Sequence, residues 1–170
     1  MNTYRSPGEQ KVGYGATFIW PACRYPCMQE IDGLELPPAK SRYLISLLKR
    51  GGHAKVGELS DEFRVDPSTV TKSIADLTAR GYLSHRPYGG VELTGEGIRY
   101  ARFLLRRHRI LGLLLSHYGF TPDDACREAS RFEDYVSRDA VDRICASMGH
   151  PVMGVCGEIS RDHDCCPEGE

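Results

Sequence analysis

Residues 55–83 read KVGELSDEFRVDPSTVTKSIADLTARGYL, and residues 86–94 read RPYGGVELT. This order predicts a short helix, a tight turn, a second helix from about residue 67 to 80 and a small hairpin, which is the winged helix-turn-helix pattern. Asp66 suits the N-cap of the second helix, and Pro67 suits its first turn. Val70, Ile74 and Leu77 recur at helical spacing and predict its buried face. Such a module usually places its second helix in the major groove of DNA.

Polar residues on and around the second helix are the candidate DNA contacts. Lys72 is the first candidate for a base or an adjacent phosphate, because it lies on the outward face of the early turns. The other candidates are Pro67, Ser68, Thr69 and Thr71 on the same helix, His85 and Arg86 in the hairpin, and Lys40 and Lys55 before the two helices. The alternative is a winged helix used only for protein contacts, because a fold does not fix a function.

Charge is distributed unevenly along the chain, although its net charge is only −1. Residues 38–109 carry 14 Lys and Arg against 7 Asp and Glu, whereas residues 110–170 carry 5 against 12. The basic excess coincides with the helix-turn-helix, which favours DNA binding over a solvated charged surface. No apolar run approaches the roughly 20 residues of a membrane span, and the first residues lack a signal-peptide core. We therefore expect a cytoplasmic protein with no membrane partner.

The chain is expected to be mainly helical, with a winged helix-turn-helix domain followed by an all-helical dimerisation domain. We divide it into an irregular Cys-containing arm (1–37), the winged helix-turn-helix (38–97), a helical dimerisation and metal-sensing domain (98–150) and a Cys-rich tail (151–170). Thr94 is expected to cap a long helix that ends near Tyr118. The apolar residues of this helix exceed what one small domain covers, which predicts a homodimer. The interface residues expected are Leu111, Leu115, Val141 and Ile144.

Four motifs resemble the DtxR/MntR family of metal-dependent repressors. They are VDPSTVTK (65–72), VELTGEG (91–97), RHRIL (107–111) and EASRFEDYVS (128–137). The resemblance covers residues 38–150 and corresponds to the short form of the family, without a C-terminal SH3-like barrel domain. It implies a dimeric, sequence-specific transcriptional regulator that binds a palindromic DNA operator and responds to Fe²⁺ or Mn²⁺.

The resemblance also implies metal ligands on two helices. His108 and Glu133 match ligand positions, and Asp134 stands where the family usually has His. Cys126 and Glu128, one or two turns earlier, could complete the site. Other ligand positions are changed, to Ala39, Arg42, Gly112 and Ser130. The alternative is that the two carboxylates pair with Arg107, Arg127 or Arg131 and that His108 is a hydrogen-bonded helix residue.

The cysteines offer a second sensing hypothesis. Cys23 and Cys27 lie in the arm, and Cys156, Cys165 and Cys166 lie in the tail near His150 and His163. They could hold Zn²⁺ or an iron–sulfur cluster, or respond to thiol oxidation. Free thiols or a disulfide are the alternatives, while Cys145 is expected to be a small core residue. We find no nucleophile–base pair, phosphate-binding loop or zinc-water motif, so we do not expect an enzyme.

Overall fold

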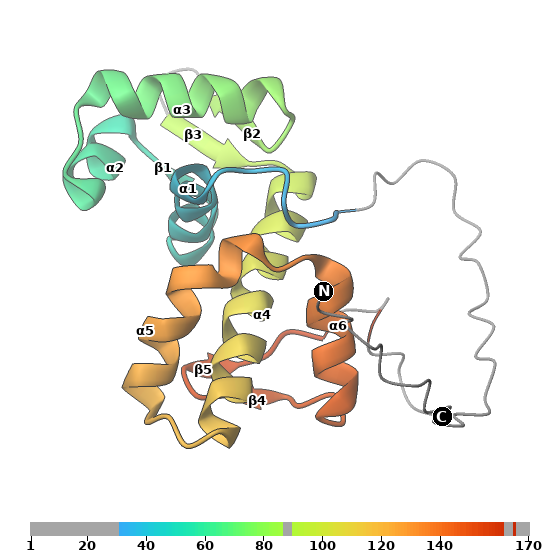
Figure 1. Cartoon of the computed structure of the whole chain (residues 1–170). Helices are drawn as coiled ribbons and strands as arrows, with labels where there is room; N and C mark the ends of the chain where they lie inside the picture. Colours follow the sequence, from blue (N-terminus) through green and yellow to red (C-terminus); the bar gives the residue numbers. More distant parts are fainter. Residues whose placement is uncertain (1–30, 87–89, 162–164, 166–170) are drawn as a thin grey trace, which may run out of the picture.

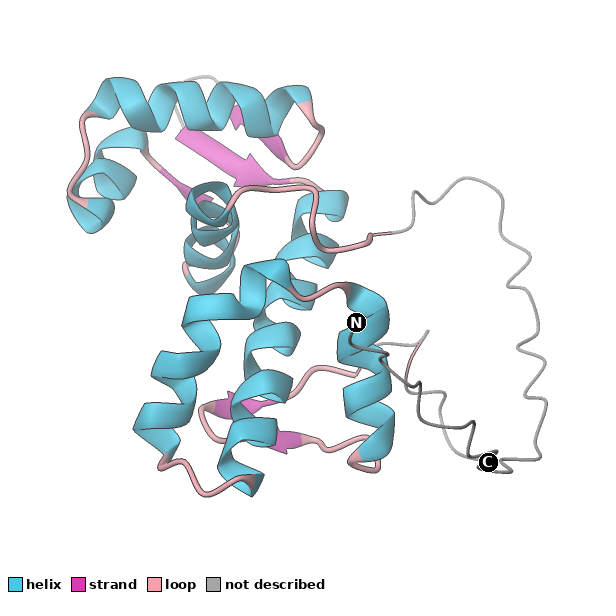
Figure 2. Cartoon of the chain, in the orientation of Figure 1, coloured by secondary structure: helices cyan, strands magenta, loops and turns pink. Residues whose placement is uncertain are grey.

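The computed structural model describes residues 31–86, 90–161 and 165. They form two stacked units joined by one long helix, α4 (Gly95–His117), which runs from the first unit into the second (Figure 1). The mainly helical architecture expected from the sequence is confirmed, and the strands of the described residues form a three-stranded and a two-stranded sheet, both small (Figure 2). Within the described residues no helix is both long and apolar enough to span a bilayer.

The first unit is a winged helix-turn-helix. Its elements are α1 (Pro38–Lys49), β1 (His53–Ala54), α2 (Val56–Phe63), α3 (Pro67–Ala79), β2 (Leu83–Arg86) and β3 (Gly90–Leu93). The antiparallel sheet has the strand order β1-β3-β2, and Leu83 lies opposite Leu93. Strand β1 was not expected, because two residues carry no readable alternation.

Helix α3 begins at Pro67, one residue after Asp66, as the sequence predicts. The side chain of Asp66 accepts no capping hydrogen bond, so that part of the prediction is wrong. The N–H of Thr69 donates instead to the backbone carbonyl of Asp66 at 2.9 Å, and water can satisfy the other N–H groups of this exposed first turn. Val70, Ile74 and Leu77 are buried, which confirms the inward face.

The second unit packs around the C-terminal half of α4. Its other elements are α5 (Pro122–Phe132), the 3₁₀ turn η1 (Glu133–Tyr135), α6 (Arg138–Ser147), β4 (Met153–Gly154) and β5 (Gly157–Glu158). Thr94 caps α4 by accepting a hydrogen bond from the Gly97 N–H at 3.0 Å, as expected. The β4–β5 hairpin was not expected in the Cys-rich tail.

Two hydrophobic clusters share α4. The larger lies beneath the winged helix-turn-helix and includes Tyr100, Phe103 and Leu104 of α4. Ile31 and Leu36 join this cluster, so the end of the segment assigned to the arm packs on the core. The smaller cluster gathers Ile110, Val141, Cys145, Ile159 and Cys165. Helix α4 therefore ties the packing of the first unit to that of the second.

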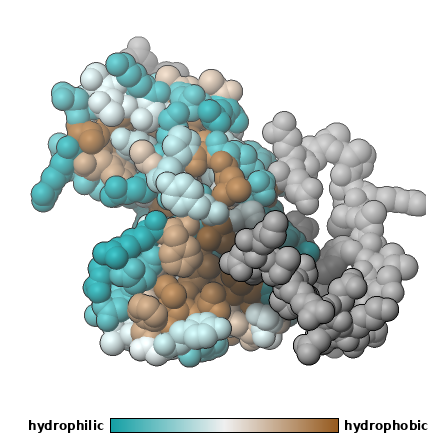
Figure 3. All heavy atoms as spheres, viewed as in Figure 1, coloured by the Kyte–Doolittle hydropathy of each residue, from teal (hydrophilic) through white to brown (hydrophobic). Residues whose placement is uncertain are grey.

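The expected dimer residues fall into two groups. Leu111 and Val141 are buried within the protomer, at 1% and 0% exposure, so they support the interior and are not at a surface. Leu115 and Ile144 are half-buried and remain available to a partner. Figure 3 shows hydrophobic residues gathered on the second unit, on the face between α5 and α6.

Candidate metal centre and reading helix

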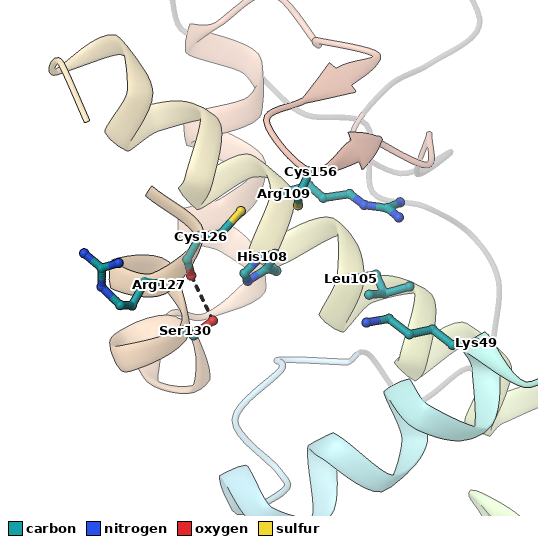
Figure 4. A pocket seen from close by; sticks show the side chains of 8 residues that line it. All are labelled: Lys49, Leu105, His108, Arg109, Cys126, Arg127, Ser130 and Cys156. Atoms are coloured by element: carbon teal, nitrogen blue, oxygen red, sulfur yellow. Dashed lines mark hydrogen bonds between the residues drawn. The ribbon is translucent and has the colours of Figure 1, made fainter. Parts of the chain in front are cut away.

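Three elements meet at His108. Helix α4 carries His108, α5 carries Cys126, and the turn of the β4–β5 hairpin carries Cys156. One ligand-type atom from each residue lies within 4.8 Å of the other two. The three side chains line a cavity of about 460 Å³ (Figure 4). Lys49, at the end of α1, lines the same cavity, so the first unit borders the site. Imidazole and thiolate are metal ligands, and this grouping is a candidate metal centre.

Glu133 positions the imidazole of His108. Its Oε2 lies 2.5 Å from His108 Nδ1, and the two side chains are only 15% and 19% exposed. An ionised carboxylate can only accept a hydrogen bond, so Nδ1 is the donor in this contact, and Nε2 is the nitrogen that a neutral imidazole would offer to a metal ion. Glu133 does not belong to the group of mutually close ligand atoms. The geometry thus gives Glu133 the place of a residue that orients a ligand.

Gly112 allows the β4–β5 hairpin to pack closely against α4. A Cβ at this position would lie 3.1 Å from Val155 Cγ2, and one at Gly154 would lie 3.2 Å from Arg109 Cβ. The two glycines therefore allow a close approach between helix and hairpin. Gly112 stands at a position where the family has an acidic ligand. Here that position is covered by the β4–β5 hairpin, which carries Cys156.

The thiol of Cys126 lies in a protected environment. Burial raises its pKa to about 11, and the hydrogen bond and charge of Cys156 act in the same direction. Without a cation the thiol stays protonated near neutral pH. A metal ion that binds there must displace its proton.

The structure does not bring Asp134 and Glu128 to this cluster. Asp134 forms an ion pair with Arg107 at 2.6 Å, and Arg107 is almost completely buried and also donates to the Gly33 carbonyl. Burial raises the pKa of Asp134 despite the opposing charge of Arg107. Glu128 pairs with Arg131 at 3.1 Å. The pairing of Asp134 with Arg107 is one of the two alternatives left open by the sequence.

Three of the positions where the family has ligands, Ser130, Arg42 and Ala39, lie in other environments. Ser130 Oγ donates to the carbonyl of Cys126 at 2.9 Å (Figure 4). The guanidinium of Arg42 lies 5.3 Å from the centroid of the Phe63 ring, and Ala39 is exposed.

Cys156 and Cys165 of the tail belong to two different groups of metal-ligand side chains. Cys156 joins His108 and Cys126, whereas Cys165 is buried beside Cys145 and His150. Cys145 is fully buried, as expected of a core residue. Cys23, Cys27 and Cys166 lie outside the described residues. Sequence spacing could not find this division, because the hairpin that turns Cys156 towards α4 has two-residue strands.

The candidate DNA contacts lie mostly on the outer surface of the first unit. Pro67, Ser68, Thr69, Thr71 and Lys72 are exposed along the early turns of α3, and Lys55 and His85 are exposed nearby. Thr71 Oγ1 donates to the Pro67 carbonyl at 2.8 Å. Arg86 ends β2. Lys40 differs, because its ammonium pairs with Asp76 of α3 at 2.6 Å and so connects α1 to α3.

The fold and the site define a winged-helix protein with a metal-binding helical domain. Residues 42–91 match the N-terminal DNA binding domain of the iron dependent repressors, and residues 94–158 match their metal binding and dimerisation domain. The HTH-type transcriptional regulator MntR of Listeria monocytogenes (serotype 4a, strain HCC23) is 35% identical over 101 residues, which are 59% of this chain and 71% of that protein. The chain belongs to this family of metal-dependent transcriptional repressors, and the resemblance seen in its motifs is confirmed.

Solved structures agree with this assignment. A manganese-dependent transcriptional repressor in complex with manganese is 28% identical, with a TM-score of 0.57 over 72% of this chain and 62% of that one. The hypothetical protein SSo2273 from Sulfolobus solfataricus has a TM-score of 0.67 at 24% identity, covers 74% of this chain and is covered completely, which shows a common fold.

Proposed function

We propose that the protein is a homodimeric regulator of transcription whose sequence-specific DNA binding responds to a divalent metal ion held by His108, Cys126 and Cys156. The observation that carries the proposal is the convergence of these three side chains on α4, the helix shared by both units. We propose that the protein acts on DNA in the cytoplasm, and we assign it no catalytic activity.

The donor set favours Fe²⁺ over Mn²⁺. Thiolates are soft ligands and suit Fe²⁺ and Zn²⁺, whereas Mn²⁺ prefers carboxylate, carbonyl and water oxygens. Cys126 and Cys156 supply two thiols to one imidazole. The carboxylate of Glu133 is engaged with His108, which leaves the group of close ligand atoms without an oxygen. We therefore propose iron as the signal, with Zn²⁺ as the competing ion and Mn²⁺ as the weaker one.

The residues transmit the signal through packing. A bound ion would supply a cross-link among α4, α5 and the β4–β5 hairpin. Glu133 holds the imidazole in one orientation, and Tyr100, Phe103 and Leu104 fix the other half of α4 beneath the winged helix. An ion that prefers one arrangement of α4 and α5 shifts the equilibrium towards it by its differential affinity. The relative placement of two reading helices in a dimer changes with that arrangement.

The DNA-reading step uses α3. In a dimer two α3 helices would enter successive major grooves of a palindromic operator, about one helical turn apart. Lys72 contacts a base or the adjacent phosphate, with Pro67, Ser68, Thr69 and Thr71 beside it. Lys55, His85 and Arg86 contact phosphates. Lys40 acts through Asp76, because their ion pair fixes the orientation of α3 on α1.

Fluorescence anisotropy tests the proposal. The duplex is first selected from a random library with the Fe²⁺-loaded protein under anaerobic conditions. We expect Fe²⁺ to tighten binding, His108→Ala to abolish that response, and the matched His117→Ala, an exposed change at the end of α4, to retain it. Lys72→Ala should lose about 1–3 kcal/mol of discrimination at one base pair. Full metal response in His108→Ala would refute the site, and unchanged specificity in Lys72→Ala would refute the placement of the reader.

A second sensing mechanism involves the same cysteines. Cys126 and Cys156 hydrogen-bond to one another, so a two-electron oxidant such as a peroxide would convert the two thiols into one disulfide with release of two protons, which removes both as metal ligands. A cluster or a thiol switch would act through Cys23, Cys27, Cys156, Cys165 and Cys166, as the sequence alternative holds. Visible absorbance of the anaerobically purified protein distinguishes an iron–sulfur cluster from a mononuclear ion.

A further inference from the structure

A second group of metal-ligand side chains lies away from the site at His108. Cys145 comes from α6, His150 follows the end of α6, and Cys165 returns from the tail. His150 Nδ1 lies 3.7 Å from Cys145 Sγ and 3.9 Å from Cys165 Sγ. One ligand atom from each residue lies within 4.8 Å of the others. The two cysteines are buried and belong to the smaller hydrophobic cluster.

These separations match those around a tetrahedral zinc ion. With Zn–S of about 2.3 Å and Zn–N of about 2.0–2.1 Å, tetrahedral angles place sulfur and nitrogen about 3.6 Å apart. The two observed sulfur–nitrogen distances exceed this value by only a few tenths of an ångström. The side chains are thus already arranged at ligand spacing.

The backbone holds His150 in this place. Its φ is 54°, a left-handed conformation that a non-glycine residue seldom adopts, and it follows Gly149 at φ 76°. The His150 N–H donates to the Cys145 carbonyl at 3.0 Å. This turn ends α6 and brings the imidazole back towards the sulfur of Cys145. A strained conformation at a ligand-type residue is typical of a functional site.

A buried arginine adds an independent observation. Arg106 is 2% exposed and pairs with Asp142 at 2.5 Å, and the charges of Cys165 and Cys145 also act on it. Its Nε and Nη2 find no hydrogen-bond partner among the described residues. A buried guanidinium whose charge interacts with those of Cys145 and Cys165 would stabilise the two thiolates once a metal has displaced their protons.

We propose that Cys145, His150 and Cys165 form a second metal site, which binds Zn²⁺ through two thiolates and one imidazole and leaves a fourth position to solvent. This site differs from the metal-responsive one, because its ion would join α6 to the tail. His150 and Cys165 flank the segment that contains the β4–β5 hairpin. The zinc would fasten both ends of that segment, and so hold Cys156 against α4.

Zinc titration of the reduced, metal-free full chain tests the proposal. Free Zn²⁺ is followed under anaerobic conditions with a competing chromophoric chelator. His150→Asn removes the imidazole while keeping a residue that tolerates a positive φ. His117→Asn is the matched control, since His117 is exposed at the end of α4. We expect His150→Asn and Cys165→Ser each to bind one zinc equivalent fewer than the wild type, and His117→Asn to bind the same number.

Two further measurements make the outcome decisive. Circular dichroism of metal-free His150→Asn should equal that of the wild type, which separates a lost ligand from a lost fold. Cys156→Ser should weaken the zinc equivalent bound at the His108 site. The double variant with His150→Asn and Cys156→Ser should therefore be impaired in two zinc equivalents. An unchanged zinc stoichiometry in folded His150→Asn would overturn the proposal. Isolation of a Cys145–Cys165 disulfide from the anaerobic protein would overturn it as well.

Discussion

Replacing Glu133 with Gln tests whether this residue orients the imidazole or binds the metal. The 2.5 Å contact to His108 Nδ1 is mostly shielded from water. Gln keeps an oxygen that can accept the Nδ1 proton but removes the charge that strengthens the bond. Loss of such a supporting contact typically lowers metal affinity about 10–100-fold, which is about 1.4–2.7 kcal/mol. We expect Glu133→Gln to shift the Fe²⁺ dissociation constant by that factor with the binding stoichiometry unchanged.

The assay is an anaerobic Fe²⁺ titration in competition with a chelator, paired with DNA anisotropy at each metal concentration. His108→Ala should remove this bound Fe²⁺ equivalent altogether. Glu128→Gln is the matched control, because Glu128 is an α5 carboxylate that pairs with Arg131 outside the cluster. If Glu133→Gln abolishes binding as completely as His108→Ala, Glu133 is a ligand. If it leaves the affinity unchanged, the contact to His108 has no role in binding, and the assigned orientation of the imidazole is refuted.

Three other predictions concern stability, pH and assembly. Asp134→Asn should cost about 3–5 kcal/mol of unfolding free energy, because it leaves the buried Arg107 without its carboxylate, while metal stoichiometry stays the same; a lost equivalent with normal stability would show that Asp134 is a ligand. Metal affinity should rise about tenfold per pH unit between pH 6 and 9 for the proton displaced from Cys126, whose pKa is about 11; a Cys126→Ser variant with the same slope would contradict this. Leu115→Glu should give a monomer in sedimentation and weaken DNA binding, and an intact dimer would place the interface elsewhere.

The helices could be predicted from the sequence because their signals are local. Thr94 caps α4 and Pro67 opens α3, and the apolar spacing of Val70, Ile74 and Leu77 gives the buried face directly. The family motifs then fixed the position of His108 on α4. By contrast, Asp66 stands at the N-cap of α3 as predicted, yet its side chain makes no capping bond, whereas Thr121 makes one ahead of Pro122 in α5.

The composition of the candidate metal centre could not be predicted in the same way. The sequence places Cys126 on α5 and Cys156 in the tail, so it assigns the first to the His108 site and the second to the alternative cysteine site. Only the β4–β5 hairpin joins them, and its strands of two residues have no periodicity to read. Asp134 shows the opposite effect, because it adjoins Glu133 in sequence, yet Arg107 draws it into an ion pair. Tertiary contacts decide which of two neighbouring carboxylates lies near the imidazole.

The packing of the β4–β5 hairpin on α4 links two changes in the site, the glycine at position 112 and the thiol of Cys156. A carboxylate at position 112 would need space that Val155 occupies, and Gly112 leaves that space to the hairpin. The hairpin in return places a thiol at Cys156 beside Cys126. In the proposed site, the absence of a carboxylate at position 112 and the supply of a thiol by Cys156 are therefore two results of one packing arrangement. With the proposed ligands, this exchange would move the preference of the site from Mn²⁺ towards Fe²⁺ and Zn²⁺, because thiolates bind the latter ions better. A Gly112→Glu variant should push the hairpin away and weaken Fe²⁺ binding, although it restores an acidic residue to α4.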